Sequence, residues 1–254
     1  MFSFSLFRQQ DVNKLLVSAI HEQQFTHVEH WLKQGADVNG IKSADLGLVP
    51  PLHLAAWYGQ DKVVELLLSR GAKVYLCAVN PENPLNKHDF DDGETPLHTA
   101  ANQGHTNVIS ILLEHGANAN ACTEKNETPL HVAAEQGHTD AIKMLLKYDA
   151  NINATNIDGK TPLDLAAEIG HYNAVECLLK RGAISSNEES LIGFLEGKKD
   201  SHIVDILRGD SIDFGEYDDN EFGGRKAIAE KAENTEVLLT GEDGKIPRSF
   251  SRFN

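Results

Sequence analysis

Short amphipathic segments, arranged in pairs, dominate the hydrophobic pattern of the chain. In residues 94–116 the apolar positions fall into two groups at helical spacing: Leu97, Ala100 and Ala101, then Val108, Ile109, Leu112 and Leu113. Thr95 suits a helix N-cap, and Pro96 suits the first helical position, where a missing N–H costs no hydrogen bond. Gly104 and Gly116 would end the two helices. The pattern therefore predicts a pair of short helices joined by a turn.

The same pair recurs along the chain. Residues 94–121 and 127–154 lie 33 positions apart and are identical at most positions. The helix-starting proline occurs at Pro51, Pro96, Pro129 and Pro162, and twenty residues after each stands Gly71, Gly116, Asp149 and Gly182, respectively. Helices this short are not stable alone, so each pair must bury its apolar face against its neighbours. The chain is expected to form a helical solenoid.

The motifs resemble those of the ankyrin-repeat family. Residues 95–100 (TPLHTA) and 128–133 (TPLHVA) are similar to the family's opening motif, and residues 50–55 and 161–166 carry variants of it. The resemblance covers about residues 11–208 and implies an all-α ankyrin-repeat solenoid of helix–turn–helix repeats with hairpin loops. About five repeats are expected, the first degenerate, with helices in residues 12–33, followed by a degenerate C-terminal cap over residues 190–208.

The remaining residues, 209–254, lack the repeat and are predicted to form an acidic, disordered tail in which residues 225–239 could form a helix. The whole chain carries 23 Lys+Arg against 38 Asp+Glu, a net charge of −15. This balance argues against a nucleic-acid partner, because phosphate binding depends on Lys and Arg. No apolar run is long enough to cross a membrane. Three cysteines without a metal-ligand spacing favour a reducing, cytoplasmic location. A monomer is the default oligomeric state.

Twelve histidines raise the question of catalysis or metal binding. Six lie in repeat motifs, where the resemblance implies structural hydrogen bonds between adjacent loops: His53, His98, His131, His105, His138 and His171. The other helix-borne histidines, His21 among them, are interpreted as solvated. No phosphate-binding, zinc-protease or serine-hydrolase motif occurs, so neither catalytic residues nor cofactors are expected.

An insertion at residues 73–92, together with a shorter one before Pro50, distinguishes the second repeat. A metal or catalytic site is the alternative interpretation of this insertion, and its donors would be Cys77, His88, Asp89, Asp91 and Asp92. The spacing of these residues matches no common metal motif.

Partner binding is expected at the variable positions of the array, because the resemblance implies that motif positions are used for packing. The candidates at inner-helix ends are Trp57, Tyr58, Asn102, Gln103, Glu135, Gln136, Glu168 and Ile169. The candidates at hairpin tips are Asp91, Asp92, Lys125 and Asp158. Together they should line one concave groove. Trp57 and Tyr58 are the strongest candidates, since both residue types are common in interface hot spots; alternatively, one ring packs beneath the insertion.

The sequence thus predicts a non-catalytic scaffold or adaptor whose protein partner has basic or amide-rich features. A second interpretation is a secreted effector of an intracellular bacterium, acting on host proteins in the host cytosol. The tail carboxylates Glu233, Glu236 and Glu242 would then form part of an export signal.

Overall fold

The computed structural model describes residues 2–40, 50–77, 93–187, Leu191 and Gly193, with side chains from Val12 onward. Within these ranges there are ten helices and no strand. They are α1 (Phe2–His21), α2 (Phe25–Lys33), α3 (Pro51–Trp57), α4 (Asp61–Ser69), α5 (Pro96–Gln103), α6 (Thr106–Glu114), α7 (Pro129–Glu135), α8 (Thr139–Lys147), α9 (Pro162–Ile169) and α10 (Tyr172–Leu179).

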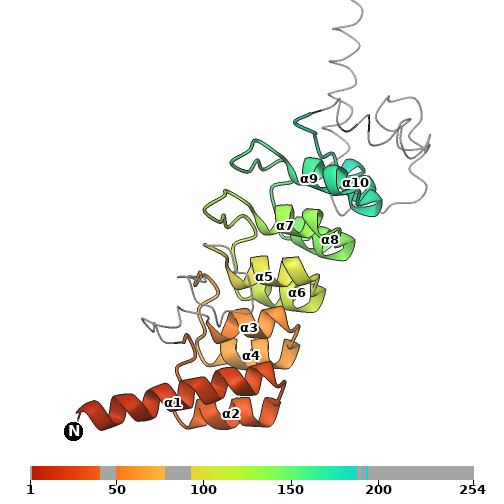
Figure 1. Ribbon diagram of the computed structural model, residues 1–254. Helices are drawn as coiled ribbons and strands as arrows, with labels where there is room; N and C mark the ends of the chain where they lie inside the picture. The colour runs from red at the N-terminus through yellow and green to blue at the C-terminus, as the bar shows by residue number, and fades with distance from the viewer. Residues whose placement is uncertain (1, 41–49, 78–92, 188–190, 192, 194–254) are drawn as a thin grey trace, which may run out of the picture.

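The helices stack in antiparallel pairs along one axis, as Figure 1 shows. The inner helices α3, α5, α7 and α9 pack on one another in series, and α4, α6, α8 and α10 form a second layer behind them. This arrangement confirms the all-α solenoid. The first pair begins earlier than predicted, since α1 starts at Phe2. The expected C-terminal cap (190–208), the tail (209–254) and its helix (225–239) lie outside the described residues, apart from Leu191 and Gly193.

Local sequence signals place the ends of the inner helices. At the start of α5, the backbone N–H of Thr95 donates to Nδ1 of His98 at 3.2 Å, and Pro96 follows at the first helical position. At its end, Gly104 adopts a φ of 71°. A Cβ at Gly104 would lie 2.7 Å from the ring of His138 in the next repeat. The glycine is therefore needed both for the left-handed turn and for close packing between repeats.

The core runs continuously between the two helix layers. Leu112 and Leu145, at equivalent positions of α6 and α8, are completely buried. Trp31 takes the corresponding position in α2, where it is half-buried and packs against this core. Trp31 therefore occupies a core-facing position while its ring keeps an exposed edge.

Buried histidines join each repeat to the next. Nε2 of His53 donates to the carbonyl of Glu94 at 2.9 Å, and Nε2 of His98 donates to the carbonyl of Glu127 at 3.0 Å. His131 makes the equivalent bond to the next hairpin at 3.1 Å. The sequence-based prediction of structural histidines is confirmed at these positions.

A second set of inter-repeat bonds comes from asparagine side chains in the turns. The side-chain oxygens of Asn39, Asn120 and Asn153 accept from the backbone N–H groups of Lys73, Asn151 and Ile184 at 2.9, 2.7 and 2.8 Å, respectively. In the second repeat the corresponding position is Tyr75, whose side chain is 66 % exposed. The turn that precedes the insertion therefore lacks this bond to the following repeat.

Candidate protein-binding surface

The ends of the inner helices form a row, because α3, α5, α7 and α9 pack in series and end at equivalent positions. We call the following residues the helix-end row: Trp57, Tyr58, Asn102, Gln103, Glu135, Gln136, Glu168 and Ile169. All of them are half-buried or exposed. The structure thus places the predicted helix-end candidates on one line along the stack.

The aromatic end of the row is held in place by its neighbours. The carbonyl of Trp57 accepts a hydrogen bond from Nε2 of His105 at 3.0 Å. The Tyr58 hydroxyl lies 2.5 Å from Nδ1 of His21, and the two rings meet edge-on with centroids 5.5 Å apart. Burial raises the pKa of Tyr58 above its ordinary value. Tyr58 therefore packs against the first repeat, and both aromatic side chains at this end of the row are half-buried.

His21 is exposed, in agreement with its interpretation as a solvated histidine, but it also contacts Tyr58 of the second repeat, which the sequence did not predict. It ends α1, just as Trp57 ends α3, so it extends the row by one repeat. The first repeat lacks the TPLH motif, and the contact of His21 with Tyr58 spans 37 positions. Trp57 precedes Gly71 by 14 positions, and counting back the same number from Gly35 would have located His21 at the helix end.

The middle of the row combines amides with a carboxylate. Asn102 and Gln103 are half-buried, and the Asn102 carbonyl accepts from Nε2 of His138 at 2.9 Å. Glu135 is also half-buried, and its carboxylate has neither a hydrogen bond nor an ion pair within the described ranges. A carboxylate in this setting is available to a donor or cation from outside the chain.

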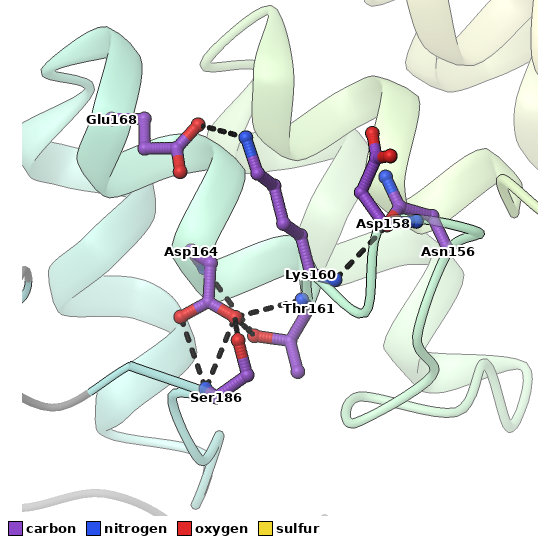
Figure 2. A network of polar contacts seen from close by, with 7 residues as sticks. All are labelled: Asn156, Asp158, Lys160, Thr161, Asp164, Glu168 and Ser186. Carbon is purple, nitrogen blue, oxygen red and sulfur yellow. Dashed lines mark hydrogen bonds and ion pairs between the residues drawn. The ribbon is translucent and has the colours of Figure 1, made fainter.

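The last repeat pairs its charges within the chain (Figure 2). Lys160 Nζ lies 2.7 Å from the carboxylate of Glu168, which joins the hairpin to the end of α9. Beyond Glu168, Ile169 is 59 % exposed. Asp158 at the hairpin tip is exposed, while its backbone N–H donates to the side chain of Asn156.

Asp164 replaces the motif histidine in this repeat and closes the described array. Its carboxylate accepts from the backbone N–H of Thr161 at 2.8 Å and from the Ser186 hydroxyl at 2.6 Å, as Figure 2 shows. Burial alone would raise the pKa of Asp164, but hydrogen bonds from Ser185, Ser186 and Thr161 outweigh it and lower the pKa. The carboxylate is thus engaged in capping two segments of the backbone.

The hairpin tips are tied to each other as well. The backbone N–H of Ile157 donates to the Lys125 carbonyl at 2.9 Å, and Asn126 Nδ2 donates to the Thr155 carbonyl at 2.8 Å. The Lys125 side chain is exposed. Asp91 and Asp92, the other two tip candidates, lie outside the described residues.

Nothing in the described ranges forms a group of three His, Cys, Asp or Glu side chains that could hold a metal ion. Of the proposed donors in the insertion, Cys77 is exposed, and His88, Asp89, Asp91 and Asp92 belong to the undescribed part. Burial raises the pKa of the Cys177 thiol, which disfavours the reactive thiolate. Among the residues that the structure describes, no helix is both long and apolar enough to span a membrane.

Comparison with protein families agrees with this geometry. A model of three ankyrin repeats matches residues 73–156 and 125–190, and a model of a single ankyrin repeat matches residues 50–80. A search of curated proteins finds no significant match. The family matches cover the helix pairs from α3 to α10 and extend over more than half of the chain, which belongs to the ankyrin-repeat family.

Proposed function

We propose that the protein is a scaffold or adaptor that binds a protein partner along the helix-end row and the adjoining hairpin tips. Ankyrin repeats are generally protein–protein interaction modules and are typically non-catalytic. The observation that carries the proposal is that the row keeps side chains that form no hydrogen bond or ion pair within the described array and are therefore available to a partner. The motif residues are buried between repeats, whereas Glu135 has no partner among the described groups and Ile169 is largely exposed.

The charges of the row favour a partner with basic or amide-rich features. Glu135 and Asp158 offer carboxylates, and Asn102 and Gln103 offer amides between them and Trp57. Charge complementarity of this kind mainly sets the association rate and the selectivity. The free cysteines Cys77, Cys122 and Cys177 are compatible with a cytoplasmic location.

A selection of random twelve-residue peptides against the full chain tests the proposal. Enriched peptides are then titrated, by fluorescence anisotropy, against a Trp57→Ala/Ile169→Ala variant. Because Trp57 is partly exposed and Ile169 is largely exposed at opposite ends of the row, we expect at least a tenfold loss of affinity. A Lys147→Ala variant, altered on the exposed face of α8, is the matched control and should bind normally. Equal binding by all three proteins would refute the assignment of the row.

The effector role remains a separate proposal about biology. It depends on the tail, which lies outside the described residues. Secretion assays with and without residues 225–254 test it, and translocation that survives the deletion counts against an export signal in this segment.

A further inference from the structure

The helix-end row and its tips present more negative than positive charge to a bound chain. Glu124, Glu127, Glu135 and Asp158 are exposed or half-buried, whereas the tips contribute one exposed cation, Lys125, and the carboxylate of Glu168 is paired with Lys160. No Lys or Arg stands in the row itself. Because unpaired carboxylates attract cations at short range, an occupant with several Lys or Arg side chains fits this surface best.

Apolar side chains mark the two ends of the same surface. Trp57 ends α3 and Ile169 ends α9, three inner-helix steps away. Helices in contact lie 8–10 Å apart, so the row extends over roughly 30 Å. An extended segment of ten residues has about the same length, since each residue spans at most 3.3–3.6 Å.

The chain itself contains a segment with these properties. Residues 245–254 (KIPRSFSRFN) include Lys245, Arg248 and Arg252 and no Asp or Glu. Apolar side chains alternate with these cations at Ile246, Phe250 and Phe253. The segment therefore combines the charge, the aromatic character and the length that the row would accept.

The connection is long enough for this segment to reach the row. Roughly 50 residues separate Gly193 from Lys245, and a chain of that length would span about 75 Å even if it were fully helical. The distance back from the last repeat to Trp57 is smaller than this span. Attachment in one chain would also make the binding intramolecular and so raise the effective concentration of the segment.

We propose that residues 245–254 bind along the helix-end row of their own chain and compete there with the protein partner. This regulatory contact rests on the proposed function of the row. The acidic segment at residues 210–221 is the less suitable occupant, because its carboxylates would face Glu135.

The first test uses the full chain and a fluorescently labelled synthetic peptide of residues 245–254. One variant replaces Lys245, Arg248 and Arg252 by Gln. The control variant makes the same change in charge at the exposed Lys14, Lys62 and Lys147. We expect the peptide to bind the tail variant about tenfold more tightly than wild type or the control variant, because the attached segment occupies the row in those two proteins. Adding Glu135→Lys to the tail variant should weaken this binding at least tenfold.

The second test follows Trp57 directly. Because the chain has two tryptophans, Trp31→Phe leaves Trp57 as the single fluorophore. Acrylamide quenching of Trp57 should rise about twofold in the tail variant and in wild type at high salt, which screens the contact, and should not change in the control variant.

Several outcomes would overturn the inference: equal peptide affinity for wild type and the tail variant, no peptide binding to either, or binding unaffected by Glu135→Lys. Library peptides that still require Trp57 and Ile169 would then leave the proposed function standing. If the library peptides also bind the Trp57→Ala/Ile169→Ala variant with unchanged affinity, both proposals fail.

Discussion

The buried histidines predict a steep loss of stability in mild acid. Burial lowers the pKa of His53 and of His98 from 6.5 to about 4, although their hydrogen bonds to the Glu94 and Glu127 carbonyls act in the opposite direction. Nδ1 of His98 accepts a hydrogen bond from the backbone N–H of Thr95. A proton on Nδ1 would remove this bond and place two N–H groups against each other. The charges of neighbouring groups also interact, His53 with His98, His98 with His131 and His131 with Asp164, so charging one ring affects the next.

The sign of the effect follows from proton binding. Between pH 6.5 and 4 the unfolded chain binds protons at these rings and the folded chain does not, so stability falls as pH falls. The contribution is fully present above pH 6.5 and is lost as pH decreases toward 4. From pH 7.5 to pH 5 the loss is about 2 kcal/mol for each of the two histidines, a large fraction of the stability of a typical domain.

Urea denaturation followed by circular dichroism at pH 7.5, 6 and 5 measures this loss. In His98→Gln the dependence of the unfolding free energy on pH should decrease by about 1 kcal/mol per pH unit between pH 6 and 5. Leu112→Ala is the control, because it destabilises the array while keeping both histidines. A flat profile in wild type, or an unchanged slope in His98→Gln, would refute the reasoning.

Three further substitutions test the packing of the array by denaturation at neutral pH. Leu112→Ala should cost about 2–5 kcal/mol, because this side chain is completely buried in α6, and an unmoved midpoint would contradict the stacking. Asp149→Gly should be neutral or stabilising by up to ~1 kcal/mol, because φ is 60° there; a clear loss of stability would show that the carboxylate has a specific role. Tyr75→Asn should stabilise by about 1 kcal/mol by adding the missing asparagine bond, while Asn120→Tyr, which removes such a bond, should destabilise; a midpoint that falls in Tyr75→Asn would argue against the comparison of turns.

Regular repeats made much of the fold predictable. The cap at Thr95, the helix end at Gly104 and the left-handed turns at Gly116 and Asp149 all depend on residues close in sequence, and each is found as expected. The periodic leucines identified the core in the same way, because a fixed repeat length places equivalent residues at equivalent depths. The helix-end row follows from the same register.

Other features could not be predicted because they depend on contacts between repeats that differ from the pattern. His21 contacts Tyr58 from a first repeat without the motif, and α1 extends back to Phe2 beyond the region that the repeats indicated. Asp164 has the position of a histidine but accepts hydrogen bonds from the serines that follow the last helix pair.

The sequence by itself determined the repeat, the helix pairs and the variable positions that are not needed for packing, since these follow from local propensity and from the repeat length. Tertiary structure decided which of those positions are available. Tyr58 forms a hydrogen bond with His21, and Glu168 forms an ion pair with Lys160. Glu135, in contrast, has no partner in the described array. The physical reason is that partners of side chains at the surface are set by distances between repeats, which no single repeat encodes.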